Sequence, residues 1–132
     1  MEQVYDVAVI GAGPGGYMAA IRCAQLGLKT VCIDAWQIDG KPAPGGTCTN
    51  VGCIPSKALL EASAKYEEVH TDFPAFGIQV ADVRLDLVQM QSRRASIVRQ
   101  TNEGILCFSG RTGLPLFQAR RLLPTDRVQV TA

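Results

Sequence analysis

The sequence predicts an α/β fold in which helices cover a parallel sheet. Three successive segments carry this prediction: an apolar run over Tyr5–Ile10, a helical segment over Pro14–Leu26 and a second apolar run over Thr30–Ile33. A strand, a helix and a strand in this order form a β-α-β unit. The two strands of such a unit lie parallel and are joined by a right-handed crossover.

Each of these elements has its own local signal. The continuous apolar run at Tyr5–Ile10 is rich in β-branched residues, which is typical of a buried parallel strand and not of a half-exposed one. Gly27 closes the helix predicted over Pro14–Leu26. This helix can lie close to a sheet because small residues recur along one face at four-residue spacing: Gly16, Ala20 and Ala24.

The rest of the chain gives weaker signals. Glycine and proline are frequent in Trp36–Gly46, which predicts a loop without regular structure. Asp86 is a suitable cap for a helix from Leu87 to about Gly104. Near the end of the sequence, Asp126–Ala132 alternates between polar and apolar residues as a strand does.

Composition limits the classes of function. A chain of 132 residues with 47% hydrophobic content can form one domain with a core. The formal net charge of +1 gives no reason to expect nucleic acid or an anionic membrane as a partner. No apolar stretch approaches the roughly 20 residues that span a bilayer. Met1–Val4 leads directly into the first strand without a signal-peptide pattern, so we expect a cytoplasmic protein.

The turn between the first strand and the helix, Gly11–Gly16, has the spacing of a dinucleotide-binding fingerprint. Gly11 permits the tight turn, Gly13 lets the backbone approach a pyrophosphate, and Gly16 allows close packing of the helix. The helix N-terminus offers amide hydrogens and a positive dipole end to the phosphates. Asp34 follows the second strand, where a carboxylate accepts hydrogen bonds from ribose hydroxyls.

Two cysteines, Cys48 and Cys53, lie five positions apart after the predicted loop. At 3.6 residues per turn, side chains five apart on a regular helix point about 140° away from each other and cannot form a disulfide. We therefore expect the pair to straddle a loop or a distorted first turn, with Gly52 and Pro55 marking the break. A helix that begins near Cys53 favours a thiolate there through its dipole and unpaired amides.

The odd total of five cysteines indicates one working pair and three free thiols, because a chain without a secretion signal rarely carries a structural disulfide framework. We expect the other three to be small hydrophobic residues of the core: Cys23, Cys32 and Cys107. Zinc also binds closely spaced cysteines, but a structural site needs four ligands, and beside the pair the sequence offers only isolated cysteines and His70. We expect no metal site, and we expect His70 to lie on the surface at a helix end.

These residues carry a family resemblance. The segment Gly45–Cys53 resembles the active-site signature of the class I pyridine nucleotide-disulfide oxidoreductases. Within that family, Ile54–Leu60 is most similar to the dihydrolipoamide dehydrogenases, and Gly40–Ala43 resembles the bacterial enzymes of 2-oxoacid dehydrogenase complexes. Glutathione and mercuric reductases share the cysteine frame but more often have Val where Ile54 stands. The resemblance runs from about Tyr5 to Leu106.

The resemblance implies a Rossmann-like FAD-binding domain and a role for each site residue. Cys53 is implied to be the charge-transfer thiolate next to the flavin, and Cys48 the interchange thiol that forms a mixed disulfide with the lipoyl group. Lys57 is implied to lie near the flavin ring and stabilise its reduced form. Asp34 matches the ribose-binding carboxylate, which is usually Glu in the family. The other implied FAD contacts are Gly11, Gly13 and Gly16 at the pyrophosphate, with Gly46 and Thr47 lining the cofactor.

For the full-length enzyme, the resemblance implies electron transfer from dihydrolipoamide through the Cys48–Cys53 disulfide and FAD to NAD. The implied partner is a lipoyl domain of a 2-oxoacid dehydrogenase complex, and the implied assembly is a homodimer. Because family enzymes are several times longer, we expect residues 1–132 to be an incomplete FAD-binding domain that lacks the NAD, central and dimer-interface domains. Two alternatives stay open: a mercuric or glutathione-type reductase, and a non-catalytic flavin-binding module.

One segment departs from the family pattern. From about Leu106 to Pro124 the sequence shows neither that pattern nor a clear period, whereas Asp126–Ala132 resembles the family again. Two explanations stand side by side: a divergent or flexible segment, and a local slip of the reading frame.

Overall fold

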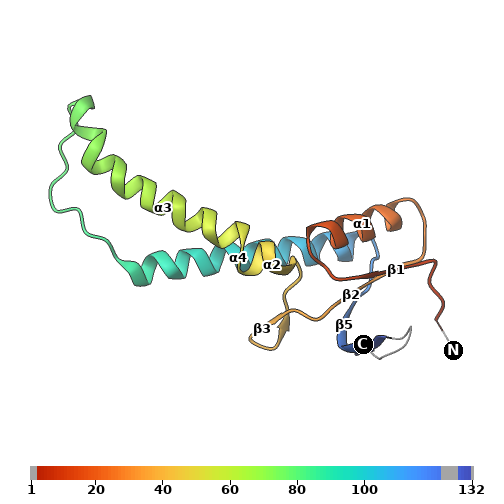
Figure 1. Cartoon of the computed structure of the whole chain (residues 1–132). Coiled ribbons are helices and arrows are strands. Elements are labelled where there is room, and N and C mark those ends of the chain that lie inside the picture. The colour runs from red at the N-terminus through yellow and green to blue at the C-terminus, as the bar shows by residue number, and fades with distance from the viewer. Residues whose placement is uncertain (1–2, 123–127, 132) are drawn as a thin grey trace.

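The computed structural model describes residues 3–122 and 128–131. It contains a four-stranded sheet, a small hairpin and a long pair of helices (Figure 1). In chain order the elements are β1 (Val7–Ile10), α1 (Pro14–Gln25), β2 (Thr30–Asp34), β3 (Gln37–Ile38), β4 (Lys41–Pro42), α2 (Gly46–Asn50), α3 (Cys53–Thr71), the 3₁₀ helix η1 (Phe73–Phe76), α4 (Leu87–Arg111), β5 (Leu116–Leu122) and β6 (Val128–Thr131).

The main sheet confirms the predicted α/β class. Its strand order is β1-β2-β5-β6. β1 pairs with β2 in parallel, β2 pairs with β5 in parallel, and β6 runs antiparallel to β5. The β-α-β unit formed by β1, α1 and β2 is the one that the sequence predicts. The predicted strand at the end of the chain is also present as β6, while residues 126, 127 and 132 of that prediction lie outside the described residues.

The core lies between α1 and the sheet and is made of small side chains. Its buried cluster consists of Ala12, Ala20, Cys32 and Leu114, with Val9, Ile21, Ala24 and Leu116 packed around it. A Cβ atom at Gly16 would overlap the carbonyl oxygen of Gly11, so the first turn of α1 touches the strand-to-helix turn directly. The predicted small-residue face of α1 is therefore the face that meets the sheet.

The burial predicted for the first strand is wrong. The strand begins at Val7 instead of Tyr5, and its residues alternate between half-buried and exposed, with Ile10 60% exposed. Among the described strands, β1 pairs with β2 alone and so forms one edge of the sheet. α1 covers one face of β1, and the alternate residues on the other face are exposed, because a parallel strand is buried on both faces only where helices cover both.

The predicted loop over Trp36–Gly46 contains a short hairpin. β3 and β4 pair antiparallel, with Ile38 opposite Lys41. Between them, Asp39 and Gly40 both have positive φ, at 51° and 73°. Two consecutive left-handed residues form the turn that matches the twist of a two-residue hairpin, and Asp-Gly is a preferred pair for it. The Asp-Gly signal was present in the sequence, so the prediction of a structureless loop was wrong.

α3 and α4 pack side by side and extend away from the sheet (Figure 1). The Asp86 carboxylate accepts a hydrogen bond from the amide of Gln89 at 2.9 Å, which confirms the predicted cap of α4. The predicted end near Gly104 is wrong, because α4 continues to Arg111. After α4 the chain enters β5, so most of the segment that seemed patternless is regular structure. The reading-frame slip stays a hypothesis.

The three cysteines outside the pair do not share one environment. Cys32 is buried in the core as predicted, and burial, followed by the charge of Asp34, raises the pKa of its thiol to about 11. Cys23 is only half-buried. Cys107 is exposed on α4, which contradicts its prediction as a core residue. All three are free thiols in the structure.

The overlap at Gly16 gives a test of the core geometry. Gly16→Ala should lower the free energy of unfolding by about 3 kcal/mol, because the new methyl group forces α1 away from the turn. Gly15→Ala is the matched control, since a Cβ there meets nothing within 4 Å, and it should change stability by less than about 1 kcal/mol. Urea denaturation of the two variants measures the difference. Equal stabilities would show that α1 does not rest on the turn.

Candidate functional site

The candidate site lies where the glycine turn after β1 meets the segment that carries the cysteines. The amide of Gly11 donates to the carbonyl of Ile33 at 2.7 Å, which fixes the turn against the end of β2. The amide of Gly45 donates to the carbonyl of Ala12 at 2.6 Å. This second hydrogen bond joins two segments that are 33 positions apart in the sequence and places the start of α2 on the fingerprint.

Gly13 and Gly46 show how close the two backbones come, but for different reasons. Gly46 has φ of +60°, and a Cβ there would lie 2.9 Å from the Cα of Gly13, so the fold itself requires glycine at position 46. Gly13 has φ of −70°, and a Cβ there would meet only the Cα of Gly46 at 4.0 Å. The packing of this chain leaves room for a side chain at Gly13. That room lies at the N-terminus of α1, where unpaired amides favour an anion such as a pyrophosphate.

The two carboxylate oxygens of Asp34 differ in their contacts: one is bonded to the backbone, and the other has no partner among the described residues. Oδ1 accepts a hydrogen bond from the amide of Ala12 at 3.2 Å and thereby holds the glycine turn. Oδ2 is buried and has no hydrogen-bond partner among the described residues. A buried carboxylate oxygen without a donor is costly, so Asp34 is set up to accept a hydrogen bond from a ligand hydroxyl. This arrangement fits the predicted ribose contact, with one oxygen available for it.

The two cysteines flank a break between two helices, as predicted. Cys48 lies within α2, which ends at Asn50, and Cys53 is the first residue of α3. Gly52 lies at the break, and a Cβ there would come within 2.9 Å of the carbonyl oxygen of Thr47. The chain can therefore change direction between the cysteines only with glycine at this position. Cys53 is exposed and Cys48 is half-buried, and both are free thiols in the structure.

The environment of Cys48 disfavours its thiolate. A hydrogen bond with the side chain of Cys53, partial burial and the charge of Cys53 all raise the pKa of the Cys48 thiol, while a backbone hydrogen bond and the ammonium of Lys57 act in the opposite direction. The contact shows that the two sulfurs are neighbours and that Lys57, one helical turn into α3, is near them. The raised pKa of Cys48 agrees with the smaller thiolate character predicted for it.

Two buried amides, which the sequence analysis did not single out, hold the cysteine segment in place. Asn102 on α4 donates to the carbonyl of Pro44 at 2.6 Å and to the side-chain oxygen of Asn50 at 3.0 Å. Asn50 in turn donates to the carbonyl of Ala43 at 2.8 Å. A single asparagine inside a helix gives no sequence signal of such a partner, because its contacts are 52 and 58 positions away.

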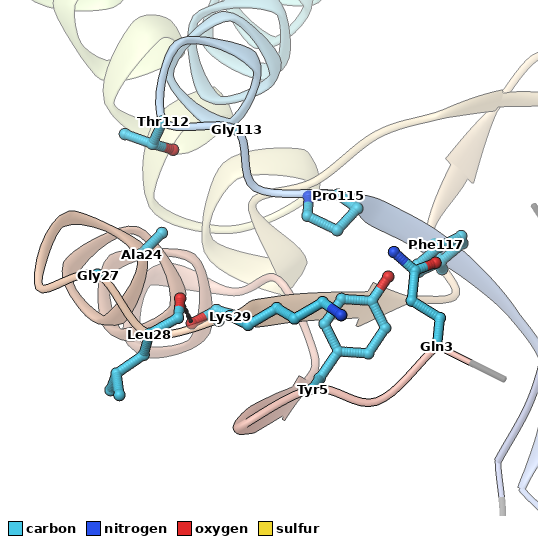
Figure 2. Close-up of a pocket in the computed structure, with 11 residues that line it drawn as sticks. Gln3, Tyr5, Ala24, Gly27, Leu28, Lys29, Thr112, Gly113, Pro115 and Phe117 are labelled. Carbon is cyan, nitrogen blue, oxygen red and sulfur yellow. Dashed lines mark hydrogen bonds between the residues drawn. The ribbon is translucent and has the colours of Figure 1, made fainter. Parts of the chain in front are cut away.

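A separate pocket lies at the other end of the strands and is a poor candidate for this site. Figure 2 shows Lys29 next to the ring of Tyr5, with residues from the ends of α1 and α4 around them. The Lys29 ammonium lies 5.6 Å from the centre of the Tyr5 ring. The pocket opens at the start of β2, whereas ligands of open α/β sheets bind at the carboxyl ends of the strands. The fingerprint, Asp34 and the cysteines all lie at those carboxyl ends.

His70 lies at the end of α3, and its Nδ1 is 2.8 Å from the carbonyl oxygen of Tyr66. It is exposed, as predicted. Within residues 3–122 and 128–131, no group of three His, Cys, Asp or Glu side chains is arranged to hold a metal ion. None of the helices described in the structure combines the length and apolar character needed to cross a membrane.

Comparisons with known proteins point to one family. The family described as pyridine nucleotide-disulphide oxidoreductase matches residues 5–129, which extends past the predicted limit near Leu106. A dihydrolipoyl dehydrogenase of Cupriavidus necator is 49% identical over 108 residues, which are 80% of this chain and 23% of that protein. The mitochondrial dihydrolipoyl dehydrogenase of Mesocricetus auratus is 52% identical over 101 residues, 76% of this chain and 20% of that protein. The chain spans about a fifth of the length of these curated relatives.

From the contact between the two thiols we predict how the reactivity of Cys48 depends on pH. In Cys53→Ala the hydrogen bond and the charge that raise the pKa of Cys48 are gone, so this pKa should fall. The rate at which iodoacetamide alkylates Cys48, followed by peptide mass spectrometry, should then reach half its maximum at a lower pH. Cys107→Ala, which removes an exposed thiol on α4, should leave the profile of Cys48 unchanged. An unchanged profile in Cys53→Ala would show that the thiols do not interact.

Proposed function

This chain belongs to the pyridine nucleotide-disulphide oxidoreductase family, and from that premise we propose that it is the flavin-binding, disulfide-bearing part of a dihydrolipoyl dehydrogenase. The observation that carries the proposal is the placement of Cys48 and Cys53 on the two sides of a helix break that rests on the glycine fingerprint. This arrangement puts a two-electron thiol couple beside a nucleotide-binding turn. The names of the relatives support the substrate class.

The residues of the fingerprint fit FAD as the cofactor. Gly13 leaves space beside the N-terminus of α1 for a pyrophosphate, and the free Oδ2 of Asp34 accepts a ribose hydroxyl. FAD, when bound, supplies a two-electron acceptor next to the thiols. Lys57 provides a positive charge near the cysteine pair, which favours a negatively charged neighbour. The predicted contacts of Gly11, Gly16, Gly46 and Thr47 belong to the same proposal.

The cysteine pair accounts for the dithiol chemistry. In the oxidised chain, a dihydrolipoamide thiolate attacks the sulfur of Cys48, the Cys48–Cys53 bond breaks, and Cys53 leaves as a thiolate. The second thiol of the substrate then attacks the mixed disulfide and releases Cys48, so the substrate is oxidised to its cyclic disulfide and the cysteine pair is reduced by two electrons. In the reverse direction Cys48 is the nucleophile that attacks the cyclic disulfide, and a less stabilised thiol suits this step because nucleophilicity towards sulfur falls as the pKa of a thiol falls.

The remaining features of the proposal concern the whole protein. NAD is the proposed final electron acceptor, a lipoyl domain of a 2-oxoacid dehydrogenase complex is the proposed partner, and the proposed assembly is a homodimer in the cytoplasm. The name dihydrolipoyl dehydrogenase, which the relatives share, supports a dihydrolipoyl group as the substrate, and several of these relatives are named as mitochondrial. The proposed assignments need segments beyond the fifth of the relatives' length that this chain covers.

Because there is free space at Gly13, a substitution at this position can change cofactor binding without changing folding. Gly13→Ala should leave the unfolding midpoint unchanged, because the new methyl group meets only the Cα of Gly46 at an ordinary contact distance. The same methyl group occupies the space proposed for the pyrophosphate, so the affinity for FAD should fall at least about tenfold. Flavin fluorescence titration measures the affinity. Gly110→Ala, an open position on α4, is the control that should change neither property. Undiminished FAD binding in Gly13→Ala would refute the assignment of the turn.

The roles of the two cysteines are tested by single substitutions in the FAD-loaded protein. Cys48→Ser leaves Cys53 as a free thiolate beside the flavin and should show a long-wavelength charge-transfer absorbance without added reductant. Cys53→Ser should not show it, because the remaining Cys48 has less thiolate character. The ultraviolet-visible spectrum measures both. Absorbance in Cys53→Ser alone would reverse the two roles, and absorbance in neither variant would contradict the placement of the pair at the flavin.

A further inference from the structure

α2, which carries Cys48, is too short to be stable by itself. It contains five residues, from Gly46 to Asn50. Because nucleation costs more than a few hydrogen bonds return, isolated helices shorter than about 12 residues are marginal in water. α2 also lacks a side-chain hydrogen bond at its N-terminal cap. Its geometry must therefore come from contacts with other elements of the fold.

The amide of Asn102 supplies contacts at both ends of α2. Its Nδ2 donates to the carbonyl of Pro44, two positions before the helix begins, at 2.6 Å. The same nitrogen donates to the side-chain oxygen of Asn50, the last residue of the helix, at 3.0 Å. Both amide hydrogens of Asn102 are thus used, and one side chain on α4 spans the length of α2.

The hydrogen bonds of Asn102 and Asn50 are buried, and two of their acceptors lie in the loop before α2. Asn50 and Asn102 are each 6% exposed, so water does not replace a lost hydrogen bond at either residue without rearrangement. The side-chain nitrogen of Asn50 donates to the carbonyl of Ala43 at 2.8 Å, which ties the end of α2 to the residue before Pro44. Removing the Asn102 amide would leave two buried acceptors, on Pro44 and Asn50, without their donor.

The position of Asn50 also sets the distance between the cysteines. Only Val51 and Gly52 separate it from Cys53, and the amide of Val51 is bonded to the carbonyl of Thr47 at 3.0 Å. A fixed Asn50 therefore fixes the direction in which the chain leaves α2 and enters α3. The hydrogen bonds from Asn102 to Pro44 and Asn50 are called the clamp below. Because Cys48 lies inside α2 and Cys53 at the start of α3, the clamp holds both sulfurs near each other before any bond forms.

We propose that Asn102 is a positioning residue for the redox chemistry of Cys48 and Cys53, acting through Asn50 and Pro44 on the helix that carries Cys48. This inference rests on the proposed function, since it requires the two cysteines to form a disulfide. Thiols held close together form a disulfide that is harder to reduce, because breaking the bond releases little conformational entropy. Without the clamp, the dithiol gains freedom and the disulfide becomes easier to reduce.

The equilibrium with glutathione measures this effect in the chain itself. Two glutathione thiols give up two electrons and two protons and are joined as glutathione disulfide. The Cys48–Cys53 bond breaks, and each of its sulfurs takes up one electron and one proton. The ratio of disulfide to dithiol in glutathione buffers near neutral pH gives the equilibrium constant, and peptide mapping under non-reducing conditions identifies Cys48 and Cys53 as the linked pair.

Asn102→Ala should shift this equilibrium about tenfold towards the dithiol, the size expected for the loss of a buried hydrogen bond. Gln100→Ala is the matched control, because it removes an exposed amide from the same helix and should change the equilibrium by less than about twofold. Circular dichroism shows that each variant is folded at the temperature of the measurement. Asn102→Ser, which keeps a hydroxyl donor, replaces Asn102→Ala if the latter unfolds, and a smaller shift in the same direction is expected.

The outcomes separate the two proposals. A folded Asn102 variant with a lower unfolding midpoint but an unchanged disulfide equilibrium overturns the positioning role and leaves the proposed function intact. A wild-type chain that does not link Cys48 to Cys53 at any glutathione ratio overturns both. An equal shift in Gln100→Ala also overturns the inference, because the effect would then come from the helix and not from the clamp.

Discussion

The site depends on one close crossing of two backbones. The glycine turn after β1 and the loop before α2 meet through the hydrogen bond from Gly45 to Ala12, and Gly46 lies directly against Gly13. Because Gly46 carries no Cβ, the two segments approach to a distance that a side chain at position 46 would prevent. The crossing places the glycine turn, which is the proposed cofactor site, beside the cysteine helix. A change in the path of either segment would separate the proposed nucleotide site from the thiol pair.

Asp34 combines a role in the fold with its proposed role as a ligand contact. Its Oδ1 holds the amide of Ala12 within the crossing, and its Oδ2 is buried and free. A shorter side chain than the glutamate usual in the family reaches the turn and still keeps one oxygen for a hydroxyl. The charge of Asp34 also extends to the neighbouring Cys32, where it adds to burial in raising the pKa of the thiol. The negative charge of Asp34 therefore acts on a thiol in the core, whose pKa it raises. The same charge disfavours a second negative group nearby, such as a 2′-phosphate.

Local patterns predicted much of the fold and of the site. The β-α-β unit, the cap at Asp86 and the break between Cys48 and Cys53 follow from residues that lie within a few positions of one another, and the structure has all three. The hairpin at Asp39–Gly40 was also a local signal, and it was missed because glycine and proline frequency was given more weight than the dipeptide. The edge position of β1 and the clamp at Asn102 could not be predicted, because they depend on which distant segments become neighbours.

The length of α4 explains how a distant residue can hold the cysteine helix accurately. The helix ends against the core: Ser109 is buried, and the amide of Leu114 donates to its carbonyl at 2.9 Å, which brings Leu114 into the cluster with Ala20 and Cys32. Asn102 precedes Ser109 by two turns of the same rigid helix, about 10 Å along its axis. The core that fixes the end of α4 therefore also fixes the position along the α4 axis at which Asn102 contacts the segment around α2. Ending the helix near Gly104, as the sequence pattern suggested, would remove this anchor and leave the clamp without a rigid support.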